Sequence, residues 1–337
     1  MSKRSTLGFI YTLQALDAAG ADLTPLKRRY GIDLKNILPD ADIERALELK
    51  IYCEILPSMS DPLTGLRIGQ TMSLAGYGPL IMLLMTCHTA WDAFQAGVRY
   101  QGLTYLFGDL QLVAGESESL LCIKPSPMPE VCRRFLIDRD LSGTFQLIRD
   151  MQTSIGVDLD PVLIRIPYPK PPEAKAYLER FSCPVEFGAS QTEIAIPTSY
   201  LATRFPAGNS TAHSLYQKQC DALLMQREKQ ASNLTEQVAE YLSLFTDVFP
   251  TSLEVATTFG MSERNFRRKL KEEDTSFRSL MDRIRFDKAK QLLEHTNLAI
   301  DAIAQQLGYA ESAAFIHAFQ RWSGITPSKF RSEHNST

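Results

Sequence analysis

The final third of the chain carries its clearest pattern of apolar and polar positions, and that pattern occurs twice. The segments Val255–Gly260 and Ile303–Gly308 each contain two apolar residues, two polar residues, one apolar residue and a glycine, at an offset of 48 positions. This spacing indicates the end of an amphipathic helix that faces a small core. The glycine suits the turn that follows, because glycine adopts a positive φ without steric cost.

A second helix is predicted after each glycine, so that each copy forms a helix-turn-helix unit. Ser262 is a favourable N-cap for the first of these helices, and the other begins near Ser312. We call them the first reading helix (residues 262–271) and the second reading helix (312–320). A longer helix over Ser279–His295 joins the two units. Each reading helix turns two residues inward, Phe266 and Leu270 in the first and Phe315 and Phe319 in the second.

Two rigidly joined units have a geometric consequence for DNA binding. A joining helix that holds the reading helices about 34 Å apart, roughly one turn of B-form DNA, lets each enter a successive major groove. Arginine binds guanine O6 and N7 or a phosphate, and small apolar side chains contact thymine methyl groups. The predicted DNA contacts are Arg264, Arg267, Arg268 and Lys271 in the first helix, Ser312, Ala313, Ile316 and His317 in the second, and Arg321 on a phosphate.

These assignments have structural alternatives. The basic side chains of the first reading helix can also be a solvated surface, the usual role of a charge run, and Arg321 can be surface charge. The second reading helix has few charges in Ser312–Gln320, so it can serve to position the domain and specify little.

The first two thirds of the chain predict an α+β domain. Helical spacing dominates up to about residue 110, with a long helix over Ile81–Tyr105 and with Gly65–Gly69 as a turn. Further helices are expected over Glu130–Ile155, Pro172–Phe181, His213–Gln230 and Leu234–Phe245, a hairpin around Gly115, a strand over Val162–Ile166, and a second hairpin that pairs Val185–Phe187 with Thr192–Ile196. We place a domain boundary near residue 230, giving a regulatory domain over 1–230 and a DNA-binding domain over 231–337.

Composition restricts the class of protein further. From Thr251 to Thr337 there are 13 Lys and Arg against 11 Asp and Glu, whereas the rest of the chain has 23 against 28. The sign of this split agrees with a DNA-binding C-terminus. None of the six cysteines lies in a metal-binding spacing, and no apolar run is long enough for a signal peptide or membrane span. We therefore expect buried or free thiols, no metal or other cofactor, no membrane association and a cytoplasmic protein.

The C-terminal residues resemble the AraC family of transcription regulators. The resemblance covers about ninety residues and is carried by Ile303-Ala304, Leu307–Tyr309, Phe315, Phe319, Arg321-Trp322, Gly324, Thr326-Pro327 and Phe330-Arg331. It implies two helix-turn-helix units joined by a helix. By this resemblance Arg264, Arg267 and Arg268 match base-reading positions of the first unit, and Ser312, Ala313 and His317 match those of the second. His317 departs from the family, which commonly has arginine there.

The N-terminal part is similar to the effector-binding domain of the subgroup that includes ornithine-utilisation and virulence regulators. The similarity lies in Gly65–Gly69, Gly76–Pro79 and Phe181–Phe187. It implies a sensor for an unidentified small molecule and a possible homodimer, and the family leans towards activators that act with RNA polymerase. The helix over His213–Gln230 is a candidate for dimer contact or signal transfer, or else an ordinary connecting helix.

The sequence disfavours two other classes of protein. An enzyme is disfavoured, because GxSxG, HExxH and P-loop motifs are absent and Cys87-His88 are better explained as structural residues. An architectural DNA-bending protein would gain nothing obvious from some 230 additional residues of acidic character. The apolar run Leu80–Met85 can line a pocket, although core packing explains it better.

Overall fold

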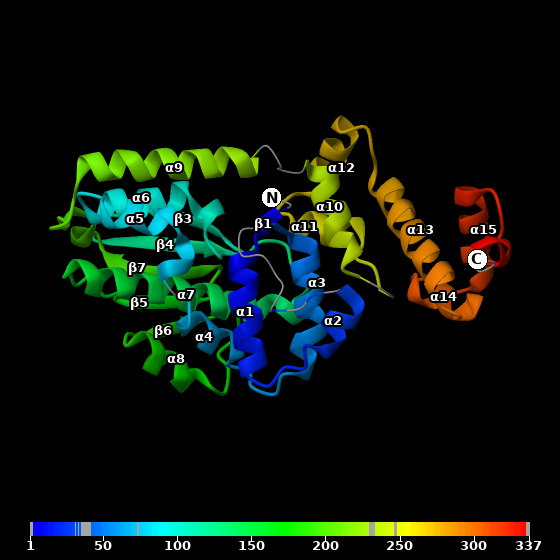
Figure 1. Cartoon of the computed structure of the whole chain (residues 1–337), viewed down its shortest axis with the longest axis horizontal. Helices are drawn as coiled ribbons and strands as arrows, with labels where there is room; N and C mark the ends of the chain where they lie inside the picture. The colour runs from blue at the N-terminus through cyan, green and yellow to red at the C-terminus, as the bar shows by residue number, and fades with distance from the viewer. Residues whose placement is uncertain are drawn as a thin grey trace. The chain divides into compact units, whose positions relative to one another are not determined.

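The computed structural model of the chain describes residues 3–30, 32, 34, 42–72, 74–228, 233–245 and 248–334. The backbone divides into two compact units, Lys3–Ala231 and Ser232–Thr337. The first contains sheet and helices and the second is helical (Figure 1). This architecture confirms the predicted class, an α+β domain followed by an all-α domain.

A five-stranded sheet forms the centre of the first unit. Its strand order is β3-β4-β7-β5-β6, and every neighbouring pair is antiparallel except β5 and β6. Figure 1 shows the strands in this order between α6 and α8. The strands are β3 (Asp109–Val113), β4 (Glu118–Lys124), β5 (Leu163–Ile166), β6 (Val185–Phe187) and β7 (Thr192–Pro197), with a separate ladder of β1 (Lys3–Ser5) and β2 (Asp42–Glu44).

The topology corrects one predicted hairpin. β3 and β4 form the expected hairpin around Gly115, but β6 and β7 do not pair with each other. Strand β5 lies between them, because the chain leaves β5, passes through α8 (Ala174–Phe181) and returns as β6 parallel to it. The residues after Phe187 do reverse the chain, as predicted, but the two strands on either side of this turn each pair with β5 and not with each other. The alternation in β5 was informative, since Ile164 and Ile166 are both fully buried.

Helix α7 (Glu130–Ile155) has the predicted bounds and is buried through most of its length. Its sheet-facing side chains, including Ile137, Leu141 and Phe145, join the main core with the inward residues of the strands. On the remaining faces α7 buries charged groups that are paired. Arg139 forms an ion pair with Asp140 at 2.7 Å, and the Asp140 carboxylate accepts hydrogen bonds from two loop amides. These bonds offset the cost of burying the charges.

The segment Gly65–Gly69, predicted as a turn, lies within helix α4 (Thr64–Gln70) instead. Its glycines allow α4 to approach α7 closely. A Cβ atom on Gly65 would lie 2.3 Å from the carbonyl oxygen of Phe135, and one on Gly69 would lie 2.7 Å from the carbonyl oxygen of Arg139. Glycine is therefore required here by backbone contact between two helices, which single-sequence punctuation rules interpret as a turn.

The predicted helix over Ile81–Tyr105 is also corrected, because it is divided into α5 (Pro79–Met85), α6 (Ala90–Arg99) and a short 3-10 turn, η3 (Gln101–Leu103). Thr89 explains why α6 begins as a separate helix. Its hydroxyl accepts from the amide of Asp92, whose carboxylate accepts from the Thr89 amide, and this reciprocal capping box begins α6.

The remaining elements of the first unit are helical. They are α1 (Thr6–Ala18), α2 (Thr24–Tyr30), α3 (Arg45–Ile55), η1 (Leu56–Ser58), η2 (Leu74–Tyr77), η4 (Thr198–Ala202) and α9 (Ser210–Glu228). Helix α9 corresponds to the helix predicted over His213–Gln230, and residues 229–230 lie outside the described residues. All six cysteines are free. Among the described residues, no helix combines the length and apolarity that crossing a membrane would demand.

The second unit consists of helices with two separate cores. Its elements are α10 (Leu234–Ser243), α11 (Ser252–Thr258), α12 (Glu263–Glu272), α13 (Phe277–His295), α14 (Ile300–Gln306), α15 (Ser312–Ser323) and α16 (Pro327–His334). The first core joins α10, α11, α12 and the beginning of α13 through Val255, Phe266 and Leu280. The second joins the end of α13 to α14, α15 and α16 through Leu293, Ile303 and Phe319.

Candidate nucleic-acid interface and apolar cavity

The two helix-turn-helix units repeat each other in hydrogen bonding as well as in sequence. Gly260 has φ of 67° and Gly308 has φ of 72°, as the pattern predicted. After each glycine the next amide turns back to a carbonyl five residues earlier, from Met261 to Ala256 at 2.9 Å and from Tyr309 to Ala304 at 3.0 Å. These bonds end α11 and α14 in the same way, so the following helices leave at equivalent positions.

Helix α12 carries the first set of predicted DNA contacts. The hydroxyl of Ser262 accepts from the amide of Asn265, which confirms Ser262 as the N-cap. Phe266 and Leu270 are completely buried. The predicted contacts Arg264, Arg267, Arg268 and Lys271 are all exposed. The sequence therefore produces a helix with one face in the core and a basic face towards solvent.

Two of these arginines pair within α12. Arg267 lies 2.5 Å from the Glu263 carboxylate, and Arg268 pairs with Glu272 and donates to the Asn265 side chain at 2.9 Å. The arginine side chains are 66% and 61% exposed, so each ion pair contributes only about 0–1 kcal/mol. A phosphate or guanine can compete for either guanidinium at little cost.

Helix α15 carries the second set. Phe315 and Phe319 are completely buried, as predicted. Ala313 and His317 are exposed, whereas Ser312 and Ile316 are partly buried. Arg321 forms a 3.2 Å ion pair with Asp282 of α13, which ties α15 to the joining helix. This side chain therefore has a structural partner in addition to its predicted phosphate contact.

Helix α13 connects the two cores and is 19 residues long, which corresponds to about 28 Å. Leu280 belongs to the first core and Leu293 to the second. Between them, the Arg285 guanidinium lies 5.1 Å from the Phe249 ring and 4.8 Å from the Tyr309 ring. Phe249 packs on the first core and Tyr309 on the second, so Arg285 links the two units by cation–π contacts on both sides.

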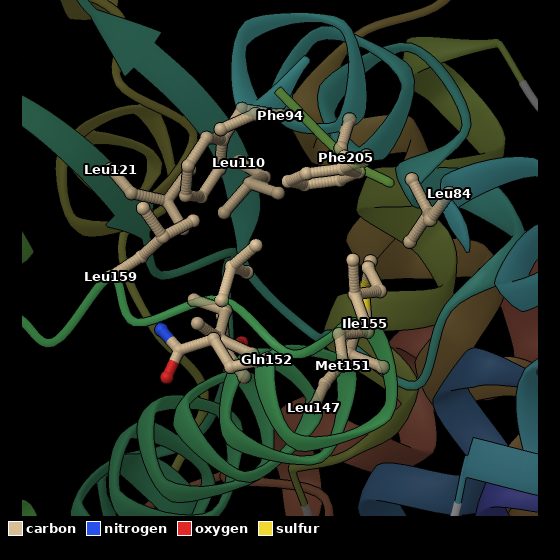
Figure 2. A pocket seen from close by; sticks show the side chains of 16 residues that line it. Leu84, Phe94, Leu110, Leu121, Leu147, Met151, Gln152, Ile155, Leu159 and Phe205 are labelled. Atoms are coloured by element: carbon tan, nitrogen blue, oxygen red, sulfur yellow. The ribbon is translucent and has the colours of Figure 1, made fainter. Parts of the chain in front are cut away.

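The first unit contains an apolar cavity of about 80 Å³. Figure 2 shows its wall, where Phe94, Leu110 and Phe205 lie opposite Leu147, Met151 and Ile155 of α7. Leu84 is the member of the predicted apolar run Leu80–Met85 that reaches this wall, while Leu80 is buried in the core. Within this run, Leu84 therefore lines a pocket and Leu80 packs in the core. Among the described residues no group of three or more His, Cys, Asp or Glu is arranged to hold a metal ion.

The cavity is polar at one notable point. Gln152 of α7 is 7% exposed, and its Nε2 atom has no hydrogen-bond partner in the described part of the chain. In Figure 2 the amide lies at the edge of the cavity near Leu159. A buried donor without an acceptor costs about 1–3 kcal/mol, which marks Gln152 as a candidate ligand contact.

Two cavity residues lie next to the anchor of α9. Leu84 belongs to α5, which packs against α9, and Phe205 precedes α9 by five residues. The Phe205 amide donates to the carbonyl of His88 at 2.9 Å, and the Asn209 amide donates to that of Thr86 at 3.1 Å. At its middle α9 is fixed by Asp221, which accepts from the Tyr100 hydroxyl at 2.7 Å. A change in the cavity wall therefore acts on the segments that position this helix.

Two helix-turn-helix units on one shared helix, which follow a separate α+β unit with a cavity in the sequence, define a DNA-binding transcription regulator with a sensor-type domain. Comparison with family models agrees: residues 20–205 match the arabinose-binding domain of AraC transcription regulators, N-terminal, and residues 255–333 match a helix-turn-helix domain. The chain belongs to the AraC family of transcription regulators. The families and relatives that it matches are regulators and not enzymes.

Curated relatives match over most of the chain. An uncharacterised HTH-type transcriptional regulator of Mycobacterium tuberculosis is 28% identical over 304 residues, covering 87% of this chain and 85% of the relative. The ornithine utilization regulator of Pseudomonas aeruginosa is 28% identical over 271 residues, covering 80% and 79%. The crystal structure of the transcriptional regulator CdpR from P. aeruginosa aligns with a TM-score of 0.48 and 23% identity, over 96% of this chain and 98% of that one.

Sequence reasoning missed two structural features of the candidate sites. Gln152 and the cavity wall carry no motif, because the lining residues come from α5, α6, α7, β3, β4 and the loops beside them. Arg285 was part of the predicted joining helix but was not singled out. The aromatic residues Phe249 and Tyr309 on either side of it were the available signal.

Proposed function

We propose that the protein is a sequence-specific regulator that binds promoter DNA with α12 and α15 in two successive major grooves. The observation that supports this most is the sharing of α13 by two similar cores, each of which leaves a reading helix with its outer face exposed. In this proposal Arg264, Arg267, Arg268 and Lys271 contact the first half-site. Ser312, Ala313, Ile316 and His317 contact the second, and Arg321 contacts a phosphate.

We further propose that a small-molecule effector, bound in the first unit, controls this DNA binding, and that the protein activates transcription with RNA polymerase in the cytoplasm. The cavity and its link to α9 support effector control. An effector changes the protein only if it favours one conformation over another. Adding the effector to an in vitro transcription reaction should raise transcript from the bound promoter, and a fall would assign repression instead.

A homodimer through α9 is part of the proposal. Leu215 and Met225 of α9 are 54% and 62% exposed, so two large apolar side chains of this helix lie at the surface, where a second copy of the chain would bury them. Sedimentation should give twice the monomer mass for the wild-type chain and the monomer mass for Leu215→Glu. A monomeric wild-type chain at micromolar concentration would remove the dimer from the proposal.

Alanine substitution in α12 tests the DNA interface. We expect Arg267→Ala and Arg268→Ala each to lose about 1–3 kcal/mol of binding free energy if the side chain reads a base, with relaxed specificity at one position. A phosphate contact would instead weaken binding to all sequences and lower the salt dependence. Lys175→Ala is a matched control, because Lys175 is an 88% exposed cation on α8 in the other unit. Unchanged affinity in both arginine variants would refute the assignment.

The second reading helix is tested by comparison with the first. His317 is exposed on α15, and as the shorter side chain it makes at most one or two hydrogen bonds to DNA. We expect His317→Ala to lose less affinity than Arg268→Ala while the footprint keeps both half-sites. Loss of the second half-site in His317→Ala would contradict this expectation.

A further inference from the structure

We infer that the apolar cavity of the first unit binds a neutral, mainly hydrocarbon small molecule that carries one hydrogen-bond acceptor. This inference rests on the proposed effector control and names the chemical class of the effector. It is carried by the lining of the cavity, by the unpaired amide of Gln152 and by the cavity volume.

The lining excludes charged and polyhydroxylated ligands. Of the 16 residues that line the cavity, 14 have apolar side chains or are glycine, and the other two, Thr144 and Gln152, are uncharged. A carboxylate placed here would lose its hydration without gaining a cation. A sugar would bury several hydroxyl groups against a wall with two polar side chains, and most of these hydroxyl groups would lose their hydrogen bonds to water without replacement. The arabinose in the name of the matched family model therefore does not describe a ligand for this cavity.

The acceptor requirement comes from Gln152. Its Nε2 atom is the buried donor at the cavity edge that lacks a partner among the described residues. A carbonyl, ether or ester oxygen accepts such a hydrogen bond, whereas a pure hydrocarbon leaves it unmade. A ligand that supplies the oxygen therefore gains about 1 kcal/mol that an equally large hydrocarbon does not, which is about a fivefold difference in affinity.

The cavity volume limits the size of the group that fits inside without a movement of the wall. A dry cavity of about 150 Å³ holds benzene, with six carbon atoms. By the same ratio about 80 Å³ holds three or four non-hydrogen atoms. Butan-2-one, with five non-hydrogen atoms, slightly exceeds this limit, so it and any longer ketone require a movement of Phe94 or Phe205. Movement of Phe205 acts directly on the segment that anchors α9.

Binding to the full-length chain is the first test, with butan-2-one as the probe and xenon as a hydrocarbon-like probe without an acceptor. We expect saturable butan-2-one binding by NMR titration below about 10 mM, with a rise in Tm. Butyrate and L-arabinose at the same concentrations should leave the spectrum of cavity residues unchanged. Absence of saturable binding of both butan-2-one and xenon would overturn the inference, and so would binding of butyrate or arabinose in the cavity.

Two substitutions locate the site. Ala93→Leu fills the cavity, because Ala93 is buried and lines it, and should reduce binding of both probes at least tenfold. Ala114→Leu, an identical change at an exposed position, is the matched control and should bind both probes normally. Gln152→Leu should weaken butan-2-one about fivefold and leave xenon within twofold. Equal effects on the two probes in Gln152→Leu would refute the role of its amide.

A second measurement separates this inference from the proposed function. Butan-2-one, or a longer ketone found to bind more tightly, is added to wild-type protein on a two-half-site duplex, and DNA affinity is measured. A changed affinity that Ala93→Leu abolishes supports both the ligand class and effector control. Cavity binding without any change in DNA affinity or transcription supports the ligand class and refutes effector control through this cavity.

Discussion

A proline in the middle of α13 tests whether the two reading helices act as one rigid element. Asp287 is suitable because its side chain is 53% exposed and belongs to neither core. Its position on α13 lies between Leu280 of the first core and Leu293 of the second. Asp287→Pro removes the hydrogen bond from residue 287 to the carbonyl of Arg283 and brings the proline ring against that carbonyl. Such a change costs about 3 kcal/mol or more in a helix interior.

The magnitude of the effect on DNA binding follows from the two cores. Each half of α13 stays packed in its own core, so each reading helix keeps its shape, but their spacing is no longer fixed. Rigid joining gives the second contact a high effective concentration, and a flexible joint lowers it by one to two orders of magnitude. We expect Asp287→Pro to bind a duplex with both half-sites about 10–100-fold more weakly than wild type. Binding to a duplex with the first half-site alone should change less than about threefold.

Fluorescence anisotropy with the two duplexes measures this difference, and footprinting shows which half-site is lost. Asp287→Ala is the control, because it removes the 2.9 Å ion pair with Lys290 but keeps the helix. That exposed pair contributes about 0–1 kcal/mol, so the control should bind like wild type. Equal binding by the proline and alanine variants would refute rigid coupling through α13. Loss of single half-site binding in the proline variant would refute the separate stability of the first core.

Three further predictions concern stability. Gly69→Ala should lower the unfolding free energy of the first unit by about 2–3 kcal/mol in chemical denaturation. The added Cβ would lie 2.5 Å from the Cβ of Ser142 and 2.7 Å from the backbone of α7. Gly97→Ala is the control and should be neutral or stabilising, because no atom lies within 4 Å of its added Cβ. Arg285→Ala should lower the unfolding free energy of the second unit by about 1–2 kcal/mol, because it removes the contacts with the Phe249 and Tyr309 rings. An unchanged denaturation midpoint would contradict the link between the cores. Burial raises the pKa of Asp138 to about 6, against hydrogen bonds from Tyr168 and Tyr177 that lower it. Since the folded pKa exceeds the unfolded value, its contribution to stability is full below about pH 4 and is lost as the pH rises through 6. The unfolding free energy of wild type minus that of Asp138→Asn should therefore fall by about 2–3 kcal/mol from pH 4 to pH 7. A difference that does not change with pH would refute the raised pKa of the Asp138 carboxyl.

The helical unit could be predicted in detail because its information is local and occurs twice. The inward positions of both reading helices, the Ser262 cap and the positive φ of Gly260 and Gly308 all follow from a few neighbouring residues. The order of strands in the first unit depends instead on pairing between distant segments. Strand β7 pairs with β4 and β5, whose residues lie up to 79 positions away, as between Glu118 and Pro197, and local turn chemistry cannot select such partners.

Charged residues in α7 show why burial in the sensor-type unit could not be predicted from the sequence, even where the bounds of a helix could. Asp138, Arg139 and Asp140 interrupt the apolar periodicity, which by itself indicates a solvent-exposed turn of helix. All three are buried, because partners from distant segments satisfy them: Tyr177 of α8 for Asp138, and the carbonyl of Tyr105 and the amide of Phe107 for Arg139 and Asp140. Gln152, on the same helix, is the counterexample, since its Nε2 donor has no such partner among the described residues. What distinguishes this donor is its place beside the apolar cavity, and for that reason we infer that its partner arrives from solution.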